Sequence, residues 1–266
     1  MENKEKADVY CGFGAYNNEL GNYEVAVDQF ERALTVNPKM DIAWNNLGNA
    51  KRSLRQFEEA LECYQKAIEC SPNRFEFYYH KGILLIELSR FNEAEGVLLE
   101  AVKLEPENID LTFQLASVYK VLRQYDEAVT YYQKCRELSP GNPDVLKNYI
   151  GSLYSSGKTI AAEALLKQYL TFPTNDISWF FVLPHEFIAE DKVEAVDQYF
   201  NVFKNKYDAL YFEWMKGFFF QRVGYTALAA SIYKGVLEKD RENQNCSYNL
   251  AQILFKEERY AESWGV

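Results

Sequence analysis

Four side chains that can both donate and accept hydrogen bonds recur at a constant spacing in this 266-residue chain. They stand 34 residues apart and are Asn46, His80, Gln114 and Asn148. A row of amide and imidazole groups suits the alternating N–H and C=O groups of an extended peptide. The pattern therefore predicts peptide binding. A solvated helix face is also polar without any ligand, so both interpretations are open at this point.

Aromatic residues and a further amide accompany this row. Tyr79 and Phe113 directly precede His80 and Gln114, and Asn49 follows Asn46 by three residues. Exposed aromatic side chains are typical anchors for a protein partner, and packing between neighbouring helices is the alternative explanation for them. The candidate partner-binding residues are Asn46, Asn49, Tyr79, His80, Phe113, Gln114 and Asn148.

Patterns that would indicate catalysis or a metal site are incomplete. The chain has two histidines, and His185 begins a zinc-protease motif whose second histidine would fall at Ala189. Gly151 and Gly157 enclose five residues, where a phosphate-binding loop has four. We therefore expect a chain that is not an enzyme and has no catalytic residues, no cofactor and no metal.

A repeating element must position the polar row. When units of 34 residues are counted from residues 7, 41, 75 and 109, place 20 is alanine, place 8 is small and place 24 is large. Small residues suit a close crossing of two helices, glycine near place 15 suits a turn, and proline near place 32 ends a helix. Each unit is therefore predicted to be a helix hairpin. The prolines at place 32 are Pro38, Pro72, Pro106 and Pro140.

The second unit carries the residues of a known repeat family. These residues, which resemble the tetratricopeptide-repeat signature, are Trp44-x-x-Leu47-Gly48, Ala60, Tyr64, Ala67 and Pro72. The resemblance implies an all-α, right-handed α-solenoid of about seven to eight stacked antiparallel helix hairpins, of the superhelical adaptor type. It also implies that the first helices line a concave groove containing the candidate residues. The amide row is similar to the asparagine ladder of O-linked N-acetylglucosamine transferase.

The period divides the chain into a tail, four regular units and a divergent part. The tail is 1–6, the regular units within 7–142 are 7–40, 41–74, 75–108 and 109–142, and the divergent units within 143–266 are 143–175, 176–209, 210–243 and the incomplete 244–266. Pro184 is expected to kink or shorten a first helix. The last unit ends before a polar cap, so we expect Leu250, Ile253, Leu254 and Trp264 to be partly uncovered and available for self-association.

Composition narrows the class of partner. The net charge of −10 opposes binding to nucleic acid and to anionic membranes, and no apolar stretch reaches the ~20 residues of a membrane helix. Five cysteines without a CxxC pair and the absence of a secretory signal predict a cytoplasmic location. Acids at place 2 favour a basic peptide, although the helix dipole also stabilises acids there. These acids are Asp8, Glu76, Asp110 and Asp144.

Chaperone-binding members of the family hold a C-terminal carboxylate with lysine, asparagine and arginine side chains at five places. In this chain those places hold Cys11, Ala15, Asn46, Glu76 and His80. The cations are missing, so we expect no carboxylate clamp for Hsp70 or Hsp90.

These observations predict a non-catalytic scaffold for protein–protein interaction that binds an extended peptide or a partner protein in its concave groove. Two other functions stay open. The chain could be a structural module that self-assembles through its incomplete last unit, or the regulatory arm of a larger enzyme that lies beyond residue 266.

Overall fold

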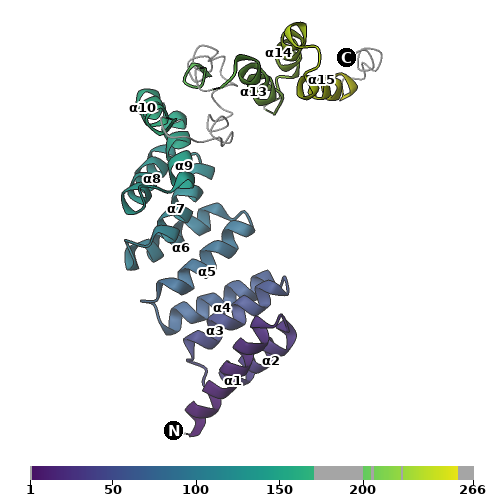
Figure 1. Ribbon diagram of the computed structural model, residues 1–266. Coiled ribbons are helices and arrows are strands. Elements are labelled where there is room, and N and C mark those ends of the chain that lie inside the picture. Colours follow the sequence, from purple (N-terminus) through teal and green to yellow (C-terminus); the bar gives the residue numbers. More distant parts are fainter. Residues whose placement is uncertain (1, 171–199, 205–206, 223, 257–266) are drawn as a thin grey trace. The chain divides into compact units, whose positions relative to one another are not determined.

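A computed structural model describes all residues except 1, 171–199, 205–206, 223 and 257–266 (Figure 1). The chain divides into two compact units, Met1–Val145 and Leu146–Val266. Each unit is treated separately below. The described residues form α-helices joined by short turns, which confirms the predicted all-α class of stacked helix hairpins.

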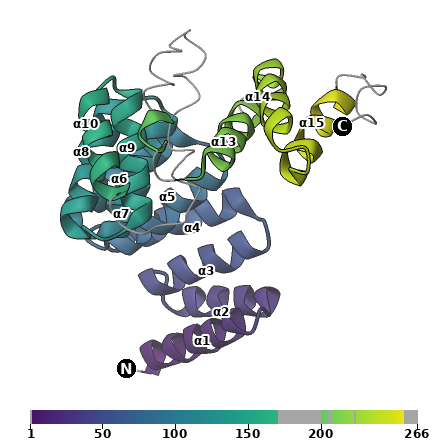
Figure 2. The ribbon, with the colours of Figure 1, turned by 45° about the horizontal axis from the view of Figure 1, so that its top comes forward.

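The first unit consists of four consecutive helix pairs. Each first helix packs against the helix that follows it, and each second helix packs against the next first helix (Figures 1 and 2). The first helices α3, α5 and α7 have 13 residues each, which keeps equivalent places in register. The helices are α1 (Glu2–Glu19), α2 (Tyr23–Val36), α3 (Asp41–Ser53), α4 (Phe57–Cys70), α5 (Phe75–Glu87), α6 (Phe91–Leu104), α7 (Ile109–Val121) and α8 (Tyr125–Leu138).

Helix α1 begins at Glu2 and therefore includes most of the segment 1–6 that was expected as a tail. The division of the chain into repeat units stays a prediction.

In each hairpin whose turn the structure describes, one turn residue has the left-handed conformation. In the α3–α4 turn, Arg55 has φ +60°, and the amide of Gln56 donates to the carbonyl of Lys51 at 2.9 Å. This bond reaches back five residues and caps the first helix. The sequence placed glycine at this turn in some units only. The residues with positive φ at place 15 are Gly21, Arg55, Ser89, Arg123, Gly157 and Gly224.

The small residue at place 8 lets the two helices of a hairpin approach closely. A Cβ atom added to Gly48 would lie 2.6 Å from the ring of Tyr64, and one added to Gly14 would lie 2.6 Å from the ring of Phe30. Both rings are completely buried. The predicted pairing of a small residue at place 8 with a large one at place 24 is therefore a direct contact.

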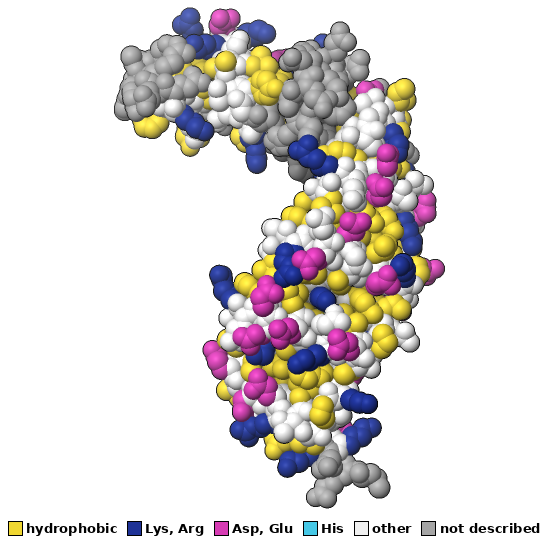
Figure 3. All heavy atoms as spheres, turned by 180° about the vertical axis from the view of Figure 1, so that it is seen from behind, with side chains coloured by type: hydrophobic (Ala, Val, Ile, Leu, Met, Phe, Trp, Pro, Cys, Tyr) yellow, Lys and Arg dark blue, Asp and Glu magenta, His cyan; other side chains and the backbone are white. Residues whose placement is uncertain are grey.

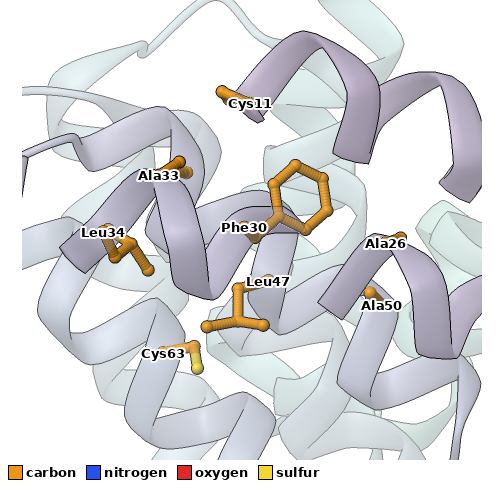
Figure 4. Packing of buried hydrophobic residues seen from close by; sticks show 9 residues of the cluster. Cys11, Ala26, Phe30, Ala33, Leu34, Leu47, Ala50 and Cys63 are labelled. Carbon is orange, nitrogen blue, oxygen red and sulfur yellow. The ribbon is translucent and has the colours of Figure 1, made fainter. Parts of the chain in front are cut away.

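Neighbouring hairpins share an apolar core. Phe30 of α2 and Leu47 of α3 lie in one buried cluster that also contains Cys11 and Cys63 (Figure 4). The prolines follow the ends of α2 and α4, and the carbonyl of Pro38 accepts a hydrogen bond from the indole Nε1 of Trp44 at 2.8 Å. The carbonyl of the next proline, at position 72, accepts a similar bond from the Tyr78 hydroxyl at 3.0 Å. Each connection is thus fastened to the following first helix.

The second unit contains further helices of the same kind. Helix α13 packs against α14, and α14 packs against α15. The boundary between the two units falls within α9. Among the described residues, no helix combines the length and the apolar character that a membrane span requires. The helices are α9 (Pro143–Ser155), α10 (Thr159–Leu170), α13 (Ala209–Arg222), α14 (Thr226–Lys239) and α15 (Gln244–Lys256).

One expectation for the second unit is wrong. Leu250, Ile253 and Leu254 are buried, although the sequence suggested that the last apolar face is partly uncovered. They lie in α15, which packs against α14, and this contact helps to bury its apolar face. Trp264 and Pro184 lie outside the described residues.

Candidate functional site

Three of the four polar residues in the row lie in the first unit, at the same place of three neighbouring helices. Asn46, His80 and Gln114 each occupy the sixth residue of α3, α5 and α7, and all three are partly exposed. Helix α3 contacts α5, and α5 contacts α7. Asn148 is the sixth residue of α9 and is also partly exposed, but it belongs to the second unit.

A residue outside the candidate set joins two members of the row. Asn45 is buried in α3, and its Oδ1 lies 2.7 Å from Nδ1 of His80. The Nδ2 of Asn45 donates to Oδ1 of Asn46 at 3.4 Å. Sequence reasoning missed this role of Asn45. The signal was a polar residue at place 5, which holds apolar or aromatic residues in the other regular units.

The surroundings of His80 fix its protonation state. Burial lowers its pKa, the nearby Arg52 lowers the pKa further, and Glu76 opposes both effects. The imidazole is therefore neutral at pH 7. Because Oδ1 of Asn45 can only accept, the proton lies on Nδ1 and leaves Nε2 as an acceptor. The ring also lies close to Tyr64 and Tyr79, with centroids 6.0 and 5.8 Å away.

Asn49 is held by the partner helix of its own hairpin. The hydroxyl of Tyr64 donates to Oδ1 of Asn49 at 2.7 Å, and burial raises the pKa of this hydroxyl. This bond fixes the orientation of the Asn49 amide and leaves its Nδ2 group as a hydrogen-bond donor. Asn49 is therefore a partly exposed donor whose orientation is set before any ligand arrives.

An ion pair joins α3 to α5 beside these residues. The guanidinium of Arg52 binds both carboxylate oxygens of Glu87, with 2.8 Å between Nε and Oε2. Planar guanidinium and carboxylate groups match in this two-bond geometry. Asn49, Arg52 and Glu87 line a shallow cavity at this end of the helices, together with Asn18 and Arg55.

The two candidate aromatic residues differ in their surroundings. Phe113 packs edge-on against Tyr132, with ring centroids 5.5 Å apart, so it contributes to the contact between α7 and α8. Tyr79 is partly exposed and contacts His80. Gln114 makes no hydrogen bond with any residue that the structure describes. All three side chains are partly exposed, and Phe113 also takes part in the packing between α7 and α8.

One of the acids at place 2, Glu76, is paired with a cation. Oε1 of Glu76 accepts from Arg74 at 3.1 Å. Burial would raise the pKa of Glu76, but the hydrogen bond and charge of Arg74 outweigh it, so the pKa is lowered. Asp110 is exposed. Mixed acidic, basic and hydrophobic side chains also cover the face of the first unit that Figure 3 shows.

The cysteines lack the features of catalytic groups. Burial raises the pKa of the Cys63 thiol to about 11 and that of Cys135 to about 12, which disfavours the reactive thiolate. All five cysteines are free thiols, and four of them are buried. Among the described residues, no group of three histidine, cysteine or acidic side chains could hold a metal ion.

Stacked helix pairs in a 34-residue register define a helical repeat protein of the solenoid class. Models of the tetratricopeptide repeat match residues 7–40, 42–74 and 63–96, and a model of YpiA-like, C-terminal tetratricopeptide repeats matches residues 110–176. Together the matches span more than half of the chain. The chain belongs to the tetratricopeptide-repeat family.

Solved structures of the same fold are similar to this chain. YrrB, a tetratricopeptide-repeat protein with an unusual peptide-binding site, is 22% identical with a TM-score of 0.59, over 68% of this chain and 93% of its own. MamA is 20% identical with a TM-score of 0.58, over 63% of this chain and 91% of its own. The pilF protein of Pseudomonas aeruginosa is 22% identical with a TM-score of 0.55, over 78% and 94%. At these identities the likeness shows the fold.

Proposed function

We propose that the first unit is a non-catalytic scaffold that binds an extended peptide, or an extended segment of a partner protein, across α3, α5 and α7. The observation that carries this proposal is the hydrogen bonding that orients three of the candidate residues, Asn46, Asn49 and His80. Asn45 orients His80 and Asn46, and Tyr64 orients Asn49. Polar groups that are fixed beforehand lose little conformational entropy when a ligand binds.

The orientation of these groups suits a peptide backbone. Nδ2 of Asn49 is a donor for a backbone carbonyl, and Nε2 of His80 is an acceptor for a backbone N–H. Gln114 supplies both kinds of group on the next helix. A ligand that meets donors and acceptors in this way is recognised through its main chain, and the side chain of Tyr79 adds an aromatic contact.

The charge of the unit supports a basic partner segment. Residues 1–145 contain 24 acidic and 16 basic residues, a net charge of −8. This excess of negative charge accelerates the approach of a positively charged segment and disfavours binding of an acidic one. A cytoplasmic location and the absence of a carboxylate clamp for Hsp70 or Hsp90 are parts of the same proposal.

YrrB provides a precedent within the same fold, because it is a tetratricopeptide-repeat protein with a peptide-binding site. A repeat scaffold can host many partners, so the identity of the bound segment depends on side chains such as Asn49, His80 and Gln114.

Affinity capture with the intact chain, followed by peptide mapping of the captured protein, tests this proposal. The double variant Asn49→Ala/Gln114→Ala should weaken binding of the mapped peptide at least tenfold in a fluorescence-anisotropy titration. The matched control is Gln133→Ala, which removes an exposed amide on the second helix α8. If the double variant binds the mapped peptide as tightly as the original chain does, the proposal that the peptide binds across α3, α5 and α7 is wrong.

A further inference from the structure

The outer face of α1 carries a row of exposed apolar side chains, called the α1 stripe here. These side chains are Val9, Phe13, Tyr16 and Leu20, and each is between 55% and 60% exposed. Their spacing of four, three and four residues places them on one side of the helix. The opposite side, which includes Ala7, is buried. Leu20 follows the last residue of α1, and its amide still donates to the carbonyl of Tyr16 at 3.2 Å.

Three of these four places are buried in α3 and in α7, whereas the place of Leu20 is partly exposed there and the place of Phe13 in α5 holds the partly exposed Lys81. In α3, Ala43, Leu47 and Ala50 occupy places 3, 7 and 10, are at most 3% exposed, and pack against α2. In α7, the equivalent places are completely or almost completely buried. The α1 stripe is therefore the face with which a first helix binds the helix before it, and no described residue covers that face in α1.

We propose that the α1 stripe binds the α1 stripe of a second copy of this chain, with the two helices antiparallel about a twofold axis. A spacing that alternates between four and three residues is the seam of a two-helix coiled coil. The order of spacings in the stripe, four, three and four, is the same in both directions along the helix. Antiparallel pairing therefore sets Phe13 opposite the partner's Tyr16. The same operation sets Val9 opposite the partner's Leu20. A twofold interface of this kind is closed and stops at a dimer.

The charges around the stripe agree with the antiparallel direction. Lys6 is exposed and lies three residues before Val9, and the equally exposed Glu5 lies four residues before Val9, on the other side of the seam. Glu24 is exposed in the first turn of α2, beyond the other end of the stripe. Antiparallel pairing sets the first turn of α1 beside the partner's α1–α2 turn, so we expect Lys6 of each copy to pair with the partner's Glu24. A parallel pairing would instead bring the two lysines together.

Space and area also permit this contact. Gly12 borders the stripe, and a Cβ atom added there would meet nothing within 4 Å, so a second helix can approach closely. Covering two aromatic and two aliphatic side chains on each copy removes on the order of 1,000 Å² of surface in total. This area lies at the lower end for specific interfaces, so we expect a dimer that forms at roughly micromolar concentrations.

Sedimentation velocity of the intact chain over roughly 1–300 μM, a range that spans the expected micromolar Kd, tests the proposal. The mass should rise with concentration from the 31.0 kDa monomer towards the dimer. Phe13→Glu and Tyr16→Glu should each raise the dissociation constant at least tenfold. Ile160→Glu is the matched control, because it places the same charge at an apolar residue that is 86% exposed on α10. Circular dichroism should give equal helicity for all variants, since every altered side chain is exposed.

A charge exchange tests the direction of pairing. Lys6→Glu and Glu24→Lys should each weaken the dimer, and the double variant should restore it. A chain that stays monomeric over the whole range would overturn the assignment to a second copy. A dimer that Phe13→Glu leaves intact would overturn the assignment to the α1 stripe, and a double variant as weak as the single ones would overturn the antiparallel arrangement.

Discussion

Asn45 of α3 and His80 of α5 lie in neighbouring helix hairpins, and their side chains meet through a 2.7 Å contact between Oδ1 and Nδ1. Asn45 is 7% exposed, so the hydrogen bond lies largely out of water. A buried polar group is costly unless it is hydrogen-bonded. This bond therefore fastens α3 to α5 and also determines which nitrogen of His80 faces a ligand.

Replacing Asn45 by alanine should destabilise the first unit. The change leaves Nδ1–H of the half-buried His80 without its acceptor, at a cost of about 1–3 kcal/mol. Urea unfolding followed by circular dichroism measures this loss. Asn46→Ala is the matched control, because Asn46 is partly exposed and its bond to Asn45 is long at 3.4 Å. If both variants unfold at the same urea concentration, the Asn45–His80 bond does not hold the hairpins together.

The lowered pKa of His80 predicts a pH dependence of stability. In the unfolded chain the imidazole takes up its proton near its ordinary pKa of about 6.5, whereas the folded chain resists protonation to a lower pH. The contribution of His80 is therefore fully present above about pH 6.5 and is lost as the pH falls through the folded pKa. His80→Gln removes the titrating group. The stability difference between the two proteins, measured by thermal unfolding from pH 7.5 to pH 5, should shrink or reverse on acidification, and a constant difference would contradict a lowered pKa.

Most of the fold could be predicted from the sequence because its determinants are local and repeated. Gly48 and Tyr64 stand 16 residues apart within one unit, so a single period revealed the helix crossing that they form. The turn was harder to predict. Arg55 adopts the conformation that glycine adopts at Gly157, and no residue preference would have indicated it.

The interactions between units could not be predicted in the same way. The bond from Asn45 to His80 depends on how far α5 slides along α3, and this register is set by apolar contacts that many side-chain pairs satisfy. The exposure of Phe13 and Tyr16 likewise depends on what lies beside α1, since the equivalent places in α3 and α7 are also apolar and are buried. Long-range register and the presence of a neighbour are properties of the assembled stack.

The close contact at place 8 gives a sharp packing prediction. In Gly48→Ala the new Cβ atom would lie 2.6 Å from Cε1 of Tyr64, whose ring is enclosed on all sides. Overpacking of this kind costs about 1–3 kcal/mol. Gly96→Ala is the matched control in α6, where an added Cβ meets nothing within 4 Å. There the gain in helix propensity should stabilise the chain by about 0.5–1 kcal/mol. Thermal unfolding should move in opposite directions for the two variants, and a rise for both would contradict the close packing.

The turn at place 15 gives the last prediction. Ser89 has φ +58°, a left-handed conformation that costs a residue with a Cβ atom about 1 kcal/mol. Ser89→Gly removes this strain, and the exposed serine side chain forms no hydrogen bond with the described residues that would be lost. We therefore expect Ser89→Gly to raise the free energy of unfolding by a few tenths of a kcal/mol up to about 1 kcal/mol. The gain is limited because glycine also has more conformational entropy in the unfolded chain. The converse change, Gly21→Ser at φ +79°, should lower stability by a similar amount. Urea unfolding of both variants checks the pair, and a loss of stability in Ser89→Gly would show that the left-handed turn is not strained.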